Sequence, residues 1–443
     1  DNRYDNIYFM DRKEIREEVY SDDKGELLYS FYVPEMECIY DKLSLDFHYR
    51  YETGYDDYAR VELGGYNNYP QGEILEKIER NHVYKLFCRF TQKIAKFELN
   101  LTVCPWEYLP PQAEEVKGEV KMTNCYMVAP GGRVDIPTEN VYKIWAQQAE
   151  FGNIPIPDGD VTAELVWQDE QGVIADEGVT VVNASERERA YLQVRTAKEG
   201  NAVVAMKVNG EIYWSWHIWC TDYEPNVTEG QKFFNNLVWM DRNLGAMTNE
   251  YTIDGGVKGL FYQWGRKDPF PASEGWTDQE KMLYTLTGTT NLSYKEVDTS
   301  ENLVEAIRQP ARFLIAITSP GDWYTNSMSL LNRTLWLPNT KTIFDPCPVG
   351  WRVPGNQPWT GLLQGGLFYS YGLVHPDAGY FPCTGYRRPQ TGRVDSLGNI
   401  VEWSAVAGST NECYGLLLNL NTIRQDWTTY WRADGRSVRC VKE

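Results

Sequence analysis

The chain has 443 residues. That length exceeds one ordinary hydrophobic core, which stops growing near about 250–300 residues, so we expect several domains. The formal net charge of -19 repels phosphate backbones and anionic lipid surfaces, which excludes nucleic acid as an expected partner. No run approaches the roughly 18 apolar residues that span a bilayer. The 30 Tyr, 16 Trp, 36 Gly and 22 Pro favour strands, turns and aromatic surfaces, a mix that suits extracellular binding proteins.

The first residue is Asp1 rather than Met, and no signal-type segment follows, so we expect that a leader has been removed and that the protein is exported. The nine cysteines are widely spaced and form no CxxC motif, which argues against a zinc site and against a complete disulfide scaffold. Cys347 and Cys440 each sit in a turn-like motif near an end of the last domain, and they are the candidate disulfide. We expect no metal and no cofactor.

Residues 1–107 are expected to form short strands separated by Gly, Pro, Asp and Asn turns. Apolar residues alternate with polar ones at 43–51 and at 97–103, which predicts a half-buried antiparallel β-sandwich. A Pro- and Glu-containing stretch at 109–119 interrupts this pattern as a linker would. We therefore place the first domain boundary there.

Residues 120–225 carry the next set of strand signals, about ten residues apart with polar turns between them. The predicted strands are 163–167, 179–182, 191–194, 202–208 and 213–219. This spacing predicts a second β-sandwich module. Within the last of these strands, Trp214, Trp216, His217 and Trp219 alternate from side to side, and we interpret them as core residues together with a contact to the next domain.

Residues 227–443 change character, because Gly, Trp and Asn become frequent and strand periodicity breaks into loops. The segment 301–318 has helical spacing that Pro310 interrupts. We expect an α+β domain with sparse regular structure. Long loops of this kind tend to carry function.

The motifs YVPE at 32–35, RNHVY at 80–84 and VCPWE at 103–107 resemble the fimbrillin-like pilins and associated adhesins of Bacteroides-type bacteria. The resemblance implies a transthyretin-like β-sandwich for residues 1–107. The middle segment, with GNAVVA at 200–205 and WSWHIW at 214–219, is similar to a module that often follows in such surface proteins.

The C-terminal part resembles the Fibrobacter succinogenes major paralogous domain through four motifs. These are FNNLVWMDRNLGA at 234–246, YQWGRKDPF at 262–270, DPCPVGWRVP at 345–354 and SVRCV at 437–441. The resemblance implies a fold related to C-type lectins and to the formylglycine-generating enzyme, and it implies a ligand-facing domain of a pilus-type adhesin. The chain ends directly after the last motif, which favours a terminal subunit over a shaft subunit.

Two motifs of this region have alternative interpretations. The segment 241–245 (DRNLG) is interpreted first as a turn in which Asp241 and Arg242 pair, and otherwise as a charged ligand site. The segment 262–268 is interpreted as a core strand that turns into a loop, with a sugar-stacking platform as the alternative. The predicted ligand-binding residues are Trp264, Arg266, Trp403, Trp427 and Trp431.

An enzyme of the formylglycine-generating or glycosidase type is the alternative function. Its candidate residues are Glu402, next to Trp403, and the thiols of Cys383 and Cys413. The four histidines are too scattered for a triad or a metal cluster, and neither HExxH nor G-x-S-x-G occurs. A shared fold does not carry a function across by itself.

The sequence therefore predicts a mainly β protein: two β-sandwich domains, 1–107 and 120–225, followed by a lectin-like α+β domain, 227–443. The predicted function is that of a non-enzymatic cell-surface adhesin, a pilus-tip or fimbria-associated subunit exported across the outer membrane. Its expected partners are other pilus subunits, held by strand exchange, and a host or microbial glycan or protein ligand.

Overall fold

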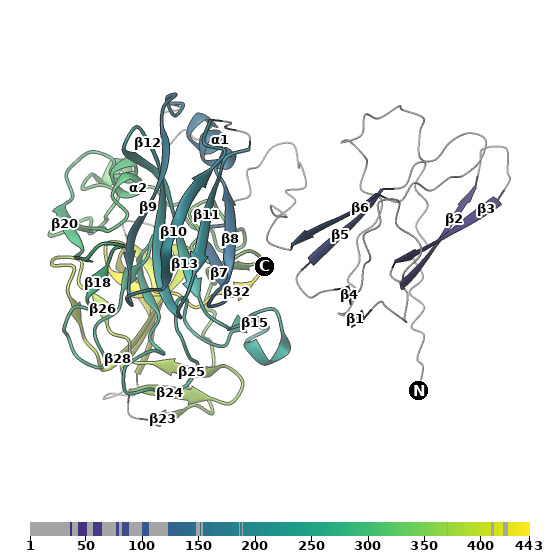
Figure 1. The fold of residues 1–443 in the computed structure, drawn as a ribbon. Helices are drawn as coiled ribbons and strands as arrows, with labels where there is room; N and C mark the ends of the chain where they lie inside the picture. The colour runs from purple at the N-terminus through teal and green to yellow at the C-terminus, as the bar shows by residue number, and fades with distance from the viewer. Residues whose placement is uncertain are drawn as a thin grey trace. The chain divides into compact units, whose positions relative to one another are not determined.

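The computed structural model describes residues 123–443 with short gaps, and within residues 1–122 it describes only the backbone of strands. The gaps are 148–150, 152–153, 186, 188, 370, 409–411 and 420–423, and the side chains of 412 and 424–429 are also outside the described part. The chain divides into two compact units, Asp1–Gln112 and Ala113–Glu443 (Figure 1). The division falls inside the segment 109–119, which the sequence predicted as a linker.

The first unit contains antiparallel strand pairs. Its described strands are β1 (Met36–Glu37), β2 (Leu43–Arg50), β3 (Asp56–Leu63), β4 (Lys77–Ile78), β5 (His82–Phe87) and β6 (Asn100–Pro105). β2 pairs with β3, β5 with β6, and β1 with β4. The alternating segment 43–51 thus contains the strand β2. The predicted sandwich packing of this unit rests on side chains outside the described residues.

The second unit begins with two sheets that share one core. Their strands are β7 (Cys125–Val128), β8 (Arg133–Pro137), β9 (Val161–Gln168), β10 (Ile174–Val182), β11 (Tyr191–Thr196), β12 (Gly200–Val208) and β13 (Glu211–Cys220). β10, β11 and β8 form one sheet, and β9, β12, β13 and β7 belong to a six-stranded sheet. Apolar side chains of both sheets enter the same cluster, which gives a sandwich-like arrangement. The five strands predicted in this segment are all present.

A helix interrupts this β-region where none was predicted. α1 (Glu139–Gln147) buries Val141, Ile144 and Trp145, which the helical spacing i, i+3, i+4 places on one face. Lys143 pairs with Glu139 one turn earlier. The sequence did not predict this helix, because its amphipathic segment is short and lies between strand signals.

The rest of the second unit consists of short strands and long loops. Its elements are η3 (Thr228–Gly230), β14 (Gln231–Phe234), β15 (Leu237–Met240), β16 (Leu260–Gln263), β17 (Phe270–Pro271), β18 (Leu283–Tyr284), β19 (Thr289–Thr290), β20 (Ser293–Glu296), α2 (Leu303–Arg308), β21 (Arg312–Ile315), η4 (Met328–Leu330), β22 (Trp351–Arg352), β23 (Leu367–Tyr369), β24 (Gly372–His375), β25 (Gly379–Pro382), β26 (Tyr386–Arg387), β27 (Val394–Asp395), β28 (Asn399–Ala407), β29 (Glu412–Asn419), β30 (Arg424–Trp431), β31 (Gly435–Ser437) and β32 (Val441–Lys442).

These elements form several further sheets. β17, β16, β31, β28, β29 and β30 follow one another in an eight-stranded sheet that β26 and β27 complete. β14, β15, β32 and β22 form a four-stranded sheet, and β23, β24 and β25 form a three-stranded one. Figure 1 shows β23 to β25 at the end of this unit opposite α1. The described chain is therefore mainly β, as predicted.

The structure places no division between compact units near residue 226, where the sequence predicted a module boundary. Strand β18 pairs with β9 through Tyr284 and Gln168 and extends the six-stranded sheet across that position. One hydrophobic cluster reaches from Cys125 to Cys440. The predicted modules 120–225 and 227–443 thus form one unit, because each has an apolar face that the other covers.

Strand β13 shows this sharing most directly. Its residues from Tyr213 to Cys220 are all buried, so both faces of the strand are covered. The ring of Trp214 lies 6.3 Å from that of Phe344, which comes from the later part of the chain. The prediction that these tryptophans are core residues is confirmed.

Helix α2 ends at Arg308, two residues before Pro310, and the chain continues as strand β21. A proline cannot continue a helix, since it lacks the N–H and its ring clashes with the preceding turn. The predicted interruption is confirmed. In the part of the chain described here, no helix is long and apolar enough to cross a membrane.

Candidate ligand-binding surface

Two of the tryptophans predicted to bind ligand, which lie just after β16 and within β28, are core residues. Trp264 and Trp403 have no exposed surface. The indole of Trp264 donates to the carbonyl of Ser404 at 2.9 Å, and that of Trp403 donates to the carbonyl of Tyr262 at 2.8 Å. Their apolar rings and satisfied N–H groups lock β16 onto β28, so a ligand at the surface does not reach them. The core-strand interpretation of 262–268 holds.

Arg266 also has a structural role in place of the predicted ligand contact. Its guanidinium, only 2 % exposed, donates to the carbonyls of Ala306 and Gln309 at the end of α2 and to that of Arg312 at the start of β21. Burial lowers the pKa of Arg266 to about 10. The cation thus satisfies the free carbonyls at a helix C-terminus, where positive charge is favourable.

The last two predicted ligand residues lie on β30. Trp431 is half-buried, and a Cβ added at Gly321 would meet its indole at 2.2 Å, so the ring lies flat against that glycine. The side chain of Trp427 lies outside the described residues. The five residues therefore do not form a common exposed surface within the described part of the chain.

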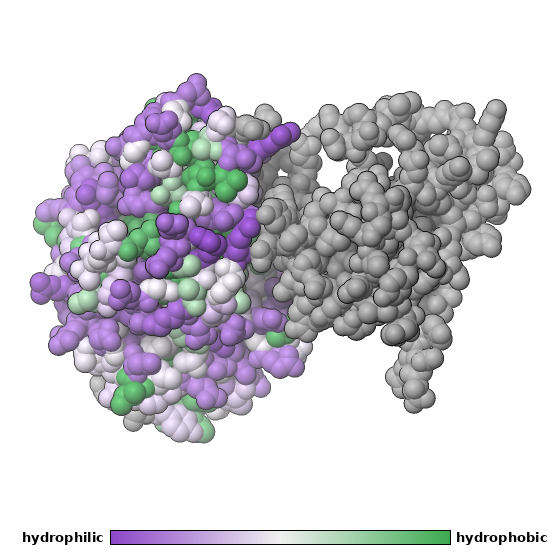
Figure 2. Space-filling view, viewed as in Figure 1, coloured by the Kyte–Doolittle hydropathy of each residue, from purple (hydrophilic) through white to green (hydrophobic). Residues whose placement is uncertain are grey.

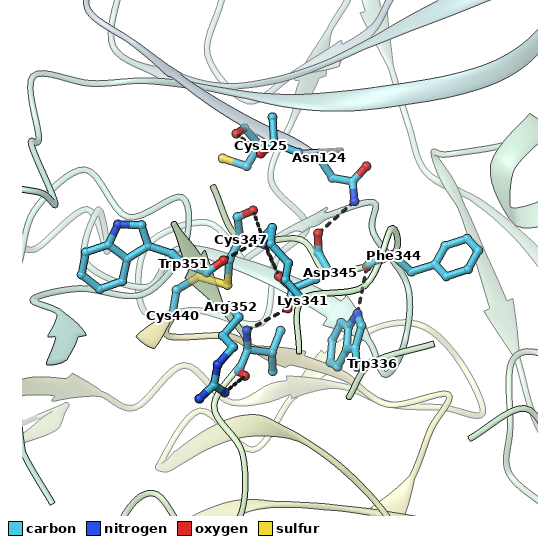
Figure 3. The surroundings of a disulfide bond; sticks show 12 residues. Asn124, Cys125, Trp336, Lys341, Phe344, Asp345, Cys347, Trp351, Arg352 and Cys440 are labelled. Carbon is cyan, nitrogen blue, oxygen red and sulfur yellow. Dashed lines mark hydrogen bonds and ion pairs between the residues drawn. A yellow bond between two sulfur atoms is a disulfide. The ribbon is translucent and has the colours of Figure 1, made fainter. Parts of the chain in front are cut away.

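Cys347 and Cys440 form a disulfide, as the sequence predicted (Figure 3). Their Cα atoms lie 6.0 Å apart although 93 positions separate them in the chain. Around the disulfide, Lys341 donates to the carbonyls of Cys347 and Trp351 at 2.6 and 2.7 Å. The amide of Asn124, just before β7, donates to the carbonyl of Asp345 at 2.9 Å. The disulfide loop is thereby tied to the first strand of the unit.

The segment 241–245 is a turn, as predicted. Arg242 donates to both carboxylate oxygens of Asp241, at 2.7 and 3.2 Å, and its guanidinium carbon lies 3.9 Å from the ring centre of Tyr223. Gly245 has φ +84°, a left-handed conformation that glycine adopts without strain. The charged side chains of this motif are therefore held by contacts within the fold.

The residues considered for catalysis are buried. Glu402 is 1 % exposed; it accepts the indole N–H of Trp359 at 3.0 Å and faces Arg439 at 3.8 Å, and burial raises its pKa. Cys383 and Cys413 have no exposed surface, and burial raises the pKa of both thiols. A thiol held in the neutral form and away from solvent is a poor nucleophile.

Three aromatic rings that the sequence did not single out gather at the surface instead. Tyr251, Trp276 and Tyr371 form what we call the aromatic cluster. Their ring centroids lie 4.5 Å apart for Trp276 and Tyr371, 5.6 Å for Tyr251 and Trp276, and 5.7 Å for Tyr251 and Tyr371. Tyr251 is 47 % exposed and Tyr371 43 %, while Trp276 is partly buried. Exposed apolar groups that adjoin one another, unlike isolated ones, mark a candidate interaction site.

The cluster is assembled from three separate loops. Trp276 is fixed to the loop of Tyr251, because its indole donates to the carbonyl of Thr252 at 2.9 Å. Beneath it, the ammonium of Lys258 lies 5.3 Å from the indole centre and donates to the hydroxyl of Ser273 at 2.8 Å. Lys258 is 1 % exposed, and burial lowers its pKa to about 8.

The loop of Tyr251 is closed by local hydrogen bonds. The amide of Gly256 donates to the carboxylate of Asp254 at 3.0 Å and to the hydroxyl of Thr252 at 3.1 Å. Gly255 has φ +77°, and a Cβ there would meet Lys258 at 2.7 Å. Asx and ST turns of this kind hold a loop without regular structure.

Tyr371 occupies the turn between β23 and β24 in an unusual conformation. Its φ is +68°, which is uncommon for a residue with a bulky side chain. Its carbonyl accepts the backbone N–H of Cys383 at 2.7 Å and the hydroxyl of Tyr380 at 2.9 Å. Strained backbone persists where the surroundings enforce it, and it gathers at functional positions.

Apolar and acidic residues surround the cluster. Ile253 is 84 % exposed, and Leu367 and Tyr369 are exposed on β23. Figure 2, drawn from the same side as Figure 1, shows apolar groups at the edge of the unit where Figure 1 places β23 and β24. The exposed carboxylates on the loops of Tyr251 and Trp276 are Glu250, Asp254, Glu274, Asp278 and Glu280, of which Glu280 pairs with Arg387. A hydrogen bond from the Thr252 hydroxyl lowers the pKa of Asp254, so this group is ionised at neutral pH.

Two of the cluster's aromatic residues carry a sequence signal, because each stands next to a glycine in the chain. Trp276 follows Gly275 and Tyr371 precedes Gly372, and an aromatic residue next to a glycine outside any periodic segment is expected in a loop. That such loops meet is a tertiary property.

The chain matches no protein-family model, no curated protein and no solved structure.

Proposed function

We propose that the chain is a non-enzymatic cell-surface adhesin, a pilus-tip or fimbria-associated subunit, whose C-terminal region binds a glycan or protein ligand through the aromatic cluster. The exposed rings of Tyr251 and Tyr371, packed against Trp276, carry this proposal. Exposed aromatic groups supply large contact areas at low cost in conformational entropy, and they dominate binding surfaces. The mainly β architecture with long loops suits such a role.

The finer architecture belongs to the same proposal. Residues 1–107 would be a fimbrillin-like, transthyretin-like β-sandwich that joins neighbouring pilus subunits by strand exchange, residues 120–225 a second β-sandwich, and residues 227–443 a lectin-like major paralogous domain. The antiparallel strand pairs described in the first unit are compatible with strand exchange, because a further strand can add to the edge of such a pair. Export across the outer membrane to the fimbrium follows from this role.

Adhesion of the purified full chain tests the ligand-binding part. Binding to epithelial cells, to mucin-coated and to fibronectin-coated surfaces is measured for the natural sequence, for Tyr251→Ala and for Tyr371→Ala. We expect binding to at least one surface and a loss of about tenfold or more in both variants, because each removes an exposed ring. Phe233→Ala is the matched control, since Phe233 is an exposed aromatic residue, 65 % accessible, on β14 outside the cluster.

The surface location is tested by immunogold labelling of intact cells that produce the protein. Gold particles on fimbriae or on the cell surface support the proposal. Labelling that appears only after the cells are opened overturns it. Binding of the natural chain to none of the three surfaces, or equal binding by the cluster variants, overturns the adhesive role of the cluster.

A further inference from the structure

We infer that the ligand of the aromatic cluster is an uncharged carbohydrate whose pyranose ring stacks on the exposed rings of Tyr251 and Tyr371, which Trp276 holds in place. This inference rests on the proposed adhesive function and names its ligand class. The apolar C–H face of a sugar ring carries slightly positive hydrogens, which are attracted to the negative face of an aromatic ring. The three rings and their surroundings select this ligand over the alternatives, as the following observations show.

The ring angles favour a flat ligand over a cation. The planes of Tyr251 and Tyr371 are 10° apart, those of Tyr251 and Trp276 21°, and those of Trp276 and Tyr371 32°. An aromatic cage for a quaternary ammonium or a methylated lysine needs ring faces that converge steeply around one point. Rings this close to parallel do not converge on one point, so they do not form such a cage, and an exposed tyrosine face suits a flat ligand.

The three rings pack against one another, so the surface open to a ligand is the exposed part of the two tyrosines. In a single column of three rings, the outer two would lie at about twice the stacking distance. Here the three centroid separations are all between 4.5 and 5.7 Å, so the rings form a triangle rather than a column. The exposure of Tyr251 and Tyr371, 47 % and 43 %, is therefore surface that a ligand can cover.

The charges around the cluster disfavour an acidic sugar. Glu250 and Asp254 flank Tyr251, and Glu274 and Asp278 flank Trp276, all four exposed. The nearby cation of Lys258 is buried and already held by Ser273, and that of Lys281 pairs with Glu170 at 3.3 Å. A sialylated or sulfated glycan would bring negative charge to a negative rim, which costs affinity.

The cluster is also preorganised, which sugar binding requires because stacking is weak for each ring. Trp276 is fixed by Thr252, and the Tyr371 backbone is fixed by Tyr380 and Cys383. Little conformational freedom is then lost on binding. Hydroxyl groups of the sugar would find acceptors in the carboxylates of the rim.

An array of immobilised neutral, sialylated and sulfated glycans tests the inference with the purified full chain. We expect binding to neutral glycans. Trp276→Ala and Tyr251→Ala should weaken it about tenfold or more, and Trp276→Phe should keep most of it, because a ring is retained. Tyr251 is half-exposed, so its variant keeps the test valid if Trp276→Ala fails to fold. Phe233→Ala should bind as the natural chain does.

A variant in which two acidic residues of the rim are neutralised gives a second test of the inference. Glu250→Gln combined with Asp254→Asn should raise binding to sialylated glycans several-fold, since Asn keeps the turn acceptor of Asp254 and removes its charge. Binding by the natural chain to sialylated or sulfated glycans alone overturns the inference. Binding to trimethylated lysine peptides with no binding to neutral glycans overturns it as well.

Adhesion to periodate-treated cells separates this inference from the proposed function, because periodate cleaves the vicinal diols of glycans. Loss of adhesion after the treatment, together with neutral-glycan binding on the array, supports both. Adhesion that survives periodate but is lost in Tyr251→Ala overturns the carbohydrate and leaves an adhesin with a protein ligand. Neutral-glycan binding without any adhesion to cells supports the site and overturns the adhesive function.

Discussion

The ammonium of Lys267 reaches Ser215 on the opposite side of the module boundary that the sequence predicted. Its Nζ lies 2.6 Å from the Ser215 hydroxyl and 2.8 Å from the Ser215 carbonyl, and it also contacts Asp268 at 2.6 Å. Lys267 and Asp268 are 1 % and 2 % exposed. Burial lowers the pKa of Lys267 to about 8, and Asp268 opposes that effect. This network joins β13 to the C-terminal part of the unit.

We therefore predict that Lys267→Met destabilises the second unit by about 3–5 kcal/mol, since it leaves the buried carboxylate of Asp268 without its cation. Urea unfolding followed by tryptophan fluorescence measures the change. Lys198→Met is the matched control: its pair with Glu170 is exposed, at 3.4 Å, and its loss should cost about 0.5 kcal/mol or less. A separate, unshifted unfolding step for residues 227–443 would contradict the shared core.

The disulfide should stabilise the unit by closing a long loop. Cys347 and Cys440 are 93 positions apart, so replacing both by Ser should cost about 4 kcal/mol through the entropy of the unfolded chain. Unfolding of the natural chain with and without reductant should show a loss similar to that of the double variant. The prediction fails if peptide mapping under non-reducing conditions finds no peptide pair that contains both residues.

Stability should fall in acid through His217. This ring is 1 % exposed, its Nε2 lies 2.9 Å from the side-chain oxygen of Asn201, and burial lowers its pKa from 6.5 to about 3. As the pH falls below 6.5, His217 therefore becomes protonated in the unfolded chain while it stays neutral in the folded chain. The neutral ring's contribution is complete above pH 6.5 and is lost as the pH falls towards 3.

At pH 4.5 this loss should amount to about 2–3 kcal/mol relative to pH 7.5. The measurement is the difference in unfolding free energy between these two pH values for the natural chain and for His217→Gln. Other groups titrate in both proteins, so their effect cancels in the comparison. An identical pH dependence in the two proteins would show that His217 does not contribute.

The left-handed backbone conformation at position 371 should lower the stability of the fold when the residue there is not glycine. Because its φ is +68°, Tyr371→Gly should be about 1 kcal/mol more stable than Tyr371→Ala, although both lose the same contacts with Trp276. Thermal unfolding compares the two variants, and the glycan array should show that neither binds well. Equal stability of the two variants would mean that the turn relaxes out of the left-handed region.

The sequence by itself determined the features that depend on neighbouring residues. Strand signals separated by polar turns predicted strands such as β9 and β12, Pro310 predicted the end of α2, and the DRNLG motif at 241–245 predicted a paired turn. Each of these follows from the conformational preferences of a short segment. The disulfide partners were identified from the turn-like motifs around them.

Only the tertiary structure decided which aromatic residues face water. Trp264 and Trp403 lie in loop-rich, Gly-rich sequence much as Trp276 does, yet the first two are buried and the third belongs to the surface cluster. The difference depends on which distant segment covers each ring, and contacts of that range leave no period in the local sequence. The shared core could not be predicted for the same reason. The segments on the two sides of residue 226 each predicted a domain, and only the folded chain shows that their apolar faces pack into one hydrophobic cluster.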